Sequence, residues 1–231
     1  MIRDRRGAAF RSIRDKPAAL IEFLPGVSPK VPTPAQAFAT GAEMARMHAA
    51  ADDFKHTRES DWPSGRILSV LRDHPITNGT RTLTNDSIVA RARSLLNLQP
   101  GDLPAGTIHA DLFPDNVLLT GGRVTGIVDF YFAHTGPLAF DLAVAHSAWS
   151  FKDGGYDPAI GRGLIEGYEA HRKLSANERD ALPRLCQSAC LRFFASRVEE
   201  WSSLPPARRK DPFDFLARWD FYARSGHAPF A

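Results

Sequence analysis

Apolar and polar positions divide the chain into a helical majority and a short central region of strands. A shorter apolar group at 67–71 predicts one helix within the polar stretch 52–84. Two capping boxes, Thr33–Gln36 and Ser175–Glu178, define the starts of two longer helices. Apolar stripes with helical spacing predict helices over 34–50, 88–98, 138–150, 157–171, 176–200 and 212–224.

The strand-like positions gather in the middle of the chain. Residues 107–109 are typical of a short strand. Residues 116–119 and 124–129 flank the turn Gly121-Gly122 and predict a β-hairpin. The pattern therefore indicates an α+β protein, mainly helical, that carries a small hairpin.

Composition excludes several classes of protein. The 231 residues are 43% hydrophobic and 24% charged, which is typical of a globular chain of one or two domains. No apolar run approaches the roughly 20 residues that span a bilayer, and residues 1–14 lack the apolar core of a secretory signal. The net charge of +3 is too small and too scattered to indicate a nucleic-acid partner. We expect a cytoplasmic protein that binds neither nucleic acid nor membrane.

The two cysteines, Cys186 and Cys190, lie four residues apart in a predicted helix. Neither has His, Asp or Glu neighbours at the spacing of a metal site. We expect them to be buried packing residues.

The segment 109–116 holds the most informative polar residues. Asp111 and Asn116 lie five residues apart on a loop between strands, and Asp129 ends the next predicted strand. Mg²⁺ prefers hard oxygen ligands, and phosphoryl transfer from ATP depends mainly on orientation and on neutralising phosphate charge. The hairpin would bring Asn116 beside Asp129 as metal ligands and leave Asp111 to accept the proton of a hydroxyl group.

The run HADLFPDNVLL at 109–119, followed by GIVDF at 126–130, resembles the aminoglycoside phosphotransferase and choline kinase superfamily, relatives of the protein kinases. The resemblance implies a protein-kinase-like fold, here mainly the helical C-terminal lobe with its catalytic β-hairpin and one remaining hinge strand. It implies ATP and Mg²⁺ as cofactors. It also implies Asp111 as the catalytic residue and Asn116 and Asp129 as the metal ligands.

Two further runs narrow the resemblance. LAFDLAVAHSAW at 138–149 and the aromatic run Phe130-Tyr131-Phe132-Ala133 are similar to the bacterial homoserine kinases of this superfamily. This similarity implies L-homoserine as the small-molecule substrate and O-phospho-L-homoserine, on the route to threonine, as the product. Two alternatives stay open: a kinase of another small alcohol, such as an aminoglycoside or choline, and a remnant that does not catalyse.

An apolar run at 17–24 that ends at a Pro-Gly turn predicts a buried strand near the N-terminus. ALIEFLPG at 19–26 resembles the hinge between the lobes in the same superfamily. The resemblance implies that the Glu22 carbonyl and the Leu24 amide meet the adenine edge, and that Ile21 lines the pocket behind it.

The N-terminal lobe of this superfamily is not recognisable in the sequence. No Gly-rich loop precedes the hinge, and Lys16 directly precedes the hinge strand instead of lying several strands upstream. We therefore expect residues 1–24 to be a remnant of the N-terminal lobe with the hinge strand, and residues 25–231 to form the helical C-terminal lobe.

Several neighbours of these site residues have simpler predicted roles. We expect His109 to order its loop by hydrogen bonding and Asp115 to be an exposed turn residue. Asp141 lies near the start of a predicted helix. The resemblance implies that it braces the catalytic loop, so we expect a structural role for it. The polar segment 153–157 either closes over a substrate or is a plain loop. Two roles are open for Tyr131, His146 and Trp149: they face the acceptor amino acid, or they pack beside a core helix as aromatic residues usually do. Of the two, we expect packing.

Overall fold

The computed structural model describes residues 1–97 and 102–230. The helices in these ranges are α1 (Pro34–Ala50), α2 (Ser64–Asp73), α3 (Asn85–Leu96), α4 (Leu138–Trp149), α5 (Pro158–Glu169), α6 (Ala176–Ser203) and α7 (Phe213–Ser225). The strands are β1 (Arg11–Ile13), β2 (Lys16–Ala18), β3 (Ile76–Thr77), β4 (Thr82–Leu83), β5 (Ala105–Ile108), β6 (Val117–Thr120), β7 (Arg123–Ile127), β8 (His134–Pro137), β9 (Phe151–Lys152) and β10 (Gly155–Tyr156).

The helices agree closely with the pattern of apolar positions. Both predicted capping boxes are present: Thr33 Oγ1 accepts from the Gln36 amide at 3.3 Å, and Ser175 Oγ accepts from the Glu178 amide at 3.2 Å. The helix predicted over 88–98 begins earlier, at Asn85, and position 98 lies outside the described residues. The fold is thus mainly helical, as predicted.

The strands form two-stranded antiparallel ladders. The predicted hairpin is confirmed as β6–β7, and both Gly121 and Gly122 have positive φ at its turn, a conformation that favours glycine. β5 pairs with β8, so the stretch that precedes the 109–116 segment is held beside the stretch that follows Asp129. The 153–157 segment forms the turn and second strand of β9–β10 and the N-cap of α5.

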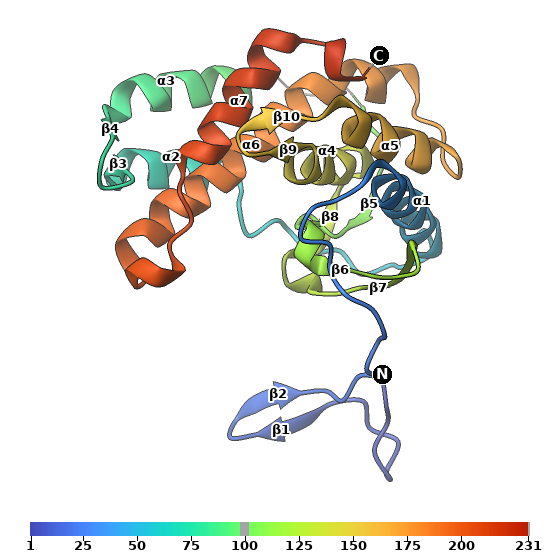
Figure 1. The fold of residues 1–231 in the computed structure, drawn as a ribbon. Helices are drawn as coiled ribbons and strands as arrows, with labels where there is room; N and C mark the ends of the chain where they lie inside the picture. Colours follow the sequence, from blue (N-terminus) through green and yellow to red (C-terminus); the bar gives the residue numbers. More distant parts are fainter. Residues whose placement is uncertain (98–101, 231) are drawn as a thin grey trace.

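Helix α4 lies inside the helical body and packs against α1, α5 and α6, while α2, α3 and α7 pack against α6 (Figure 1). Every residue from Asp141 to Trp149 is buried. One apolar cluster joins α4 to α2, α3, α6 and α7, and the other joins it to α1 and α5. No helix in the described ranges is long and apolar enough to cross a membrane.

Glycine permits an unusually close approach of α1 and α5. A Cβ atom on Gly167 would overlap the backbone carbonyl of Phe38, and one on Gly41 would overlap the carbonyl of Leu164. These helices therefore pack backbone against backbone, which only glycine at the crossing allows.

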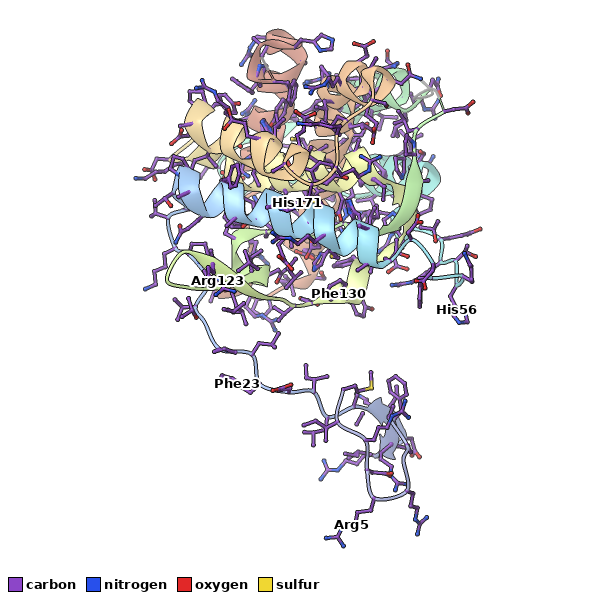
Figure 2. All side chains as sticks on the ribbon, turned by 90° about the vertical axis from the view of Figure 1, so that its right-hand side faces the viewer. Arg5, Phe23, His56, Arg123, Phe130 and His171 are labelled. Atoms are coloured by element: carbon purple, nitrogen blue, oxygen red, sulfur yellow. The ribbon has the colours of Figure 1, made fainter. Side chains whose placement is uncertain are left out.

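The N-terminal residues stand apart from the helical body. The β1–β2 hairpin lies beyond an extended segment, from which Phe23 projects (Figures 1 and 2). The buried strand predicted over 17–24 is wrong: only Lys16–Ala18 is a strand, and Ile21 and Phe23 are 65% and 93% exposed. An apolar run is buried only where another layer covers it, and no layer in the described ranges covers this one.

The extended segment joins the body along the β6–β7 hairpin, where Thr125 Oγ1 donates to the Pro25 carbonyl. Val27 and Leu119 exchange backbone hydrogen bonds of 3.0 Å, which form a bridge between the extended segment and β6. Upstream of that bridge, Leu20 forms an isolated antiparallel bridge with Ile2. The two ends of the 1–24 region are therefore tied to each other more than to the helical body.

Candidate active site

The 109–116 segment begins where β5 ends, and Asp141 of α4 fixes its first residues. Asp141 Oδ2 accepts from the His109 amide at 2.8 Å, and Oδ1 accepts from the Ala110 amide at 2.7 Å. Ala110 has a φ of 62°, a left-handed conformation that needs such support outside glycine. The brace expected of Asp141 is present in this geometry.

Asp141 is fully buried and belongs to a larger polar network. His48 of α1 donates through Nε2 to Asp141 Oδ2 at 3.0 Å, and its Nδ1 lies 2.9 Å from the Tyr168 hydroxyl of α5. Burial acts to raise the pKa of Asp141, but the hydrogen bonds from His48 and the His109 amide hold it below its ordinary value. The carboxylate therefore stays ionised and connects the loop to three helices.

His109 orders the loop from within, as predicted. Its Nδ1 accepts from the Asp111 amide at 3.2 Å, so the ring proton is on Nε2, which donates to the Val128 carbonyl at 2.9 Å. This pair of hydrogen bonds ties Asp111 to the residue before Asp129. The ring lies in the core side of the loop and is buried.

Asp111 and Asn116 are held in direct contact. Asn116 Nδ2 donates to the Asp111 carbonyl at 2.8 Å and to Asp111 Oδ2 at 3.3 Å. Because the amide nitrogen is used in this way, Asn116 Oδ1 remains as the free acceptor of the side chain. The spacing of five residues thus places both side chains on one side of the loop.

A pocket of about 230 Å³ opens beside the loop, and Asp111, Asn116 and Asp129 all line it. Asp129 follows β7 with a φ of 65° and caps the short 3-10 helix Phe130–Phe132. The structure therefore brings together the three residues that the sequence predicts for chemistry. An amide oxygen and a carboxylate are hard ligands that suit Mg²⁺ shared with phosphate. No cluster of three or more His, Cys, Asp or Glu with metal-site geometry occurs in the described ranges.

The environment of Asp111 makes it a stronger base than an ordinary carboxylate. Burial raises its pKa, while the nearby positive charge of Arg192 and the His109 ring act in the opposite direction. Arg192 Nη1 lies 3.4 Å from Asp111 Oδ1. The carboxylate is thus oriented on one side by Asn116 and on the other by an arginine of α6.

Sequence comparison places the chain in a family. The phosphotransferase enzyme family, APH, matches residues 5–174. This chain belongs to that family. The homoserine kinases of Xanthobacter autotrophicus and Granulibacter bethesdensis are similar to it, with 41% identity over 227 residues and 39% over 236. These alignments cover 96% and 98% of this chain and 70% and 73% of the relatives.

Solved structures of the same phosphotransferase fold also resemble the chain. An amicoumacin kinase matches with a TM-score of 0.63 at 15% identity, over 97% of this chain and 70% of that one. An ethanolamine kinase of Plasmodium vivax matches with a TM-score of 0.63 at 11% identity, over 90% and 65%. The predicted kinase-like fold is therefore confirmed.

The residues predicted to meet adenine lie in the N-terminal part of the chain. Ile21, Glu22 and Leu24 belong to the extended segment between the β1–β2 hairpin and the body, and none lines the pocket that holds Asp111. Ile21 and Glu22 are exposed. Their role in binding the nucleotide stays a prediction.

The remaining predictions divide between packing and exposure. His146 is buried with Nδ1 2.6 Å from the Tyr222 hydroxyl, and Trp149 donates to the Leu112 carbonyl at 3.0 Å, so both pack as expected. Tyr131 is 70% exposed, so the expectation that it packs is wrong, because it lies on a 3-10 turn at the surface. Asp115 is exposed, as predicted.

The cysteines also behave as predicted. Cys186 and Cys190 are free and buried, and burial raises the pKa of the Cys190 thiol to about 12. Both thiols therefore stay protonated and unreactive at neutral pH.

Sequence reasoning missed Arg192, which lines the pocket. Its signal was a lone charge within the apolar run 189–195 of a predicted helix, where a cation is rare without a partner. Trp62, in the polar stretch before α2, was also missed, and it lines the same pocket.

Proposed function

We propose that this chain is an ATP-dependent homoserine kinase, which converts L-homoserine and ATP to O-phospho-L-homoserine and ADP, a reaction on the route to threonine. The observation that carries the proposal is the pocket in which Asp111, Asn116 and Asp129 meet. The names of the similar curated proteins point to homoserine as the acceptor. The use of ATP and the amino-acid acceptor favour a cytoplasmic location.

In this proposal Asp111 orients the acceptor and takes its proton. The acceptor oxygen forms a bond to the γ-phosphorus, the bond from that phosphorus to the β,γ-bridging oxygen breaks, and the hydroxyl proton passes to Asp111. The hydrogen bonds from Asn116 and the proximity of Arg192 fix the orientation of the carboxylate before substrate arrives.

Asn116 Oδ1 and the Asp129 carboxylate are the groups that would hold Mg²⁺ in this pocket. The metal, when bound, neutralises the charge on the transferred phosphoryl group. The protein's own part is to keep these two oxygens on the side of the pocket next to Asp111. The hydrogen bond from the Val128 amide to the Asn116 carbonyl, 3.0 Å long, holds the two strands in that register.

The adenine base of ATP would bind to the extended segment near the N-terminus. We propose that Ile21, Glu22 and Leu24 meet adenine through a backbone carbonyl, a backbone amide and an apolar side chain. Their support is the resemblance of the 19–26 run to the hinge of the family and the exposure of the segment, which leaves its backbone groups accessible. We likewise propose that residues 1–24 and 25–231 are separate units, since the extended segment divides them (Figure 1).

The test is a phosphoryl-transfer assay with Mg²⁺-ATP and L-homoserine. Asp111→Asn keeps the size of the side chain but removes the base, and we expect the turnover rate to fall by about 10²- to 10⁴-fold. Asp86→Asn, an exposed carboxamide exchange on α3, is the matched control and retains full activity.

Other outcomes would replace the proposal. Turnover of choline or an aminoglycoside without turnover of homoserine would assign the site to another small alcohol. Full activity of Asp111→Asn would remove Asp111 from the chemistry. If no acceptor is phosphorylated while calorimetry detects nucleotide binding, the chain is a binding remnant and not a kinase.

A further inference from the structure

Arg192 is a nearly buried cation that lines the pocket beside Asp111. Its side chain on α6 is 8% exposed, and its guanidinium carbon lies 4.1 Å from the Phe193 ring centroid and 4.6 Å from the Phe132 ring centroid. Burial lowers the pKa of Arg192 to about 10, with Asp111 acting to raise it, so the group is a cation at neutral pH. Aromatic rings stabilise the flat faces of the cation and leave its edge for hydrogen bonds.

The edge of this guanidinium has spare donors. Among the described residues, its one hydrogen bond to the protein is the 3.4 Å contact from Nη1 to Asp111 Oδ1, which is long for a charge-assisted pair. A buried arginine ordinarily uses several of its N–H groups, because each one left without an acceptor costs stability. No nitrogen of Arg192 is among the enclosed side-chain atoms that lack a partner in the described residues, so its remaining donors face the space of the pockets and are available to a ligand.

A second pocket, of about 160 Å³, lies on the other side of the same arginine. Arg192, Trp62 and Phe132 line both pockets and form their common wall. The rest of the second pocket's lining consists of three serines, four apolar residues, an aspartate and a histidine: Ser60, Ser64, Ser188, Ile67, Leu96, Ala110, Phe140, Asp61 and His134. The pocket accommodates the head group of a small molecule.

Resting on the proposed function, we propose that Arg192 binds the α-carboxylate of the acceptor amino acid, whose head group occupies the second pocket while its hydroxyl reaches Asp111. In homoserine the hydroxyl and carboxylate are separated by three carbon atoms, which sets them about 5 Å apart. Arg192 touches Asp111 from the first pocket and lines the second, so it spans that separation. The planar guanidinium matches a carboxylate with two parallel hydrogen bonds.

Asp61 gives the second pocket its selectivity for a zwitterion. Asp61 is the one acidic residue among the described residues that line this pocket. At the surface it also forms an ion pair with Arg58, whose Nη2 lies 2.6 Å from Asp61 Oδ2. The pocket thus offers a cation for the carboxylate and an anion for the ammonium group. Acceptors that carry only positive charge, such as choline and the aminoglycosides, would bring a like charge and no carboxylate of their own to the buried guanidinium.

The test compares two acceptors that differ by the carboxylate. Kinetics with L-homoserine and with 3-amino-1-propanol, which has the hydroxyl and the amine but no carboxylate, are measured for the wild-type chain and for Arg192→Gln. We expect Arg192→Gln to lower kcat/KM for homoserine by about 100-fold. The loss for 3-amino-1-propanol should be at least tenfold smaller than the loss for homoserine, because it reflects only the contact through which Arg192 orients Asp111. The KM for ATP should not change, because the proposal gives Arg192 no nucleotide contact.

Two further variants keep the result interpretable. Arg192→Lys retains the charge without the planar fork, and we expect an intermediate loss that also falls on homoserine more than on the amino alcohol. Arg179→Gln removes an exposed arginine of the same helix, about 20 Å away along its axis, and should behave as wild type. Circular dichroism spectra of all variants report whether the fold is kept.

Each outcome decides between the proposals. Equal losses for both acceptors would show that Arg192 acts only through Asp111, and a raised KM for ATP would make it a phosphate ligand; either result overturns the carboxylate proposal while homoserine kinase activity stands. A wild-type chain that phosphorylates 3-amino-1-propanol but not homoserine would overturn the proposed function itself. If Arg192→Gln does not fold, the homoserine preference of Arg192→Lys decides, and an unchanged preference overturns the proposal.

Discussion

The 109–116 loop and the 17–24 segment reverse what their residue types alone suggest. The loop is rich in charge, yet His109 and Ala110 are buried. The segment is apolar, yet Phe23 is 93% exposed. The difference lies in the partners that each finds: Asp141 accepts the first two amides of the loop, whereas the segment meets no covering layer in the described residues. Whether a segment is buried therefore depends more on the hydrogen-bonding or packing partners available to it than on the polarity of its residues.

The largest expected effect is on the loop's anchor. Asp141→Ala leaves two buried amides and His48 without their acceptor, and we expect the free energy of unfolding to fall by about 3–5 kcal/mol. Chemical denaturation monitored by circular dichroism measures it. The matched control is Asp214→Ala, which removes a 57% exposed partner of Arg197 and should cost about 1 kcal/mol or less. Equal losses in the two variants would contradict the special role of the loop anchor.

The second effect tests how tightly the body is packed. Gly167→Ala places a methyl group against the Phe38 carbonyl and should lower the free energy of unfolding by about 1–3 kcal/mol. Gly65→Ala is the control on α2, where nothing lies near the added carbon, and it should be neutral or stabilise by up to about 1 kcal/mol. A stabilised Gly167→Ala would show that α1 and α5 separate without cost.

The third effect is a dependence on pH within the body. Burial lowers the pKa of His146 to about 3, so below its ordinary value of 6.5 the unfolded chain takes up a proton that the folded chain does not. His146 should therefore have no effect on the pH dependence of the free energy of unfolding above pH 6.5. Below pH 6.5 it should lower that free energy by up to about 1.4 kcal/mol for each pH unit. Thermal unfolding of His146→Gln should show a shallower decline between pH 6.5 and 4.5. Identical slopes would mean that His146 is accessible to protons in the folded chain.

The smallest effect belongs to the N-terminal segment. Phe23→Ser should change the free energy of unfolding of the body by about 0.5 kcal/mol or less, because the ring makes little contact. Phe194→Ser, in the fully buried part of α6, is the matched substitution and should cost about 3–5 kcal/mol or more. A large loss from Phe23→Ser would mean that the segment is covered in solution.

Local patterns predicted most of the helices and the three residues of the proposed chemistry. The capping boxes at Thr33 and Ser175 and the glycine turn at 121–122 are decided by neighbours in sequence, so reading the chain was enough. The β3–β4 ladder was not predicted, because strands of two residues are too short to show an alternating pattern of apolar and polar positions. Arg192 was not predicted, because its position between the two pockets depends on residues that are distant from it in sequence.

The two hydrogen bonds from the loop to Asp141 have a consequence for exchange with solvent deuterium. Amides in loops usually exchange within seconds or minutes, because local fluctuations expose them. The amides of His109 and Ala110 are buried and held by a carboxylate that also binds α1, so they can open only when the helical body opens. The amide protons of His109 and Ala110 should therefore be among the last in the molecule to exchange, at rates similar to those of the core helices.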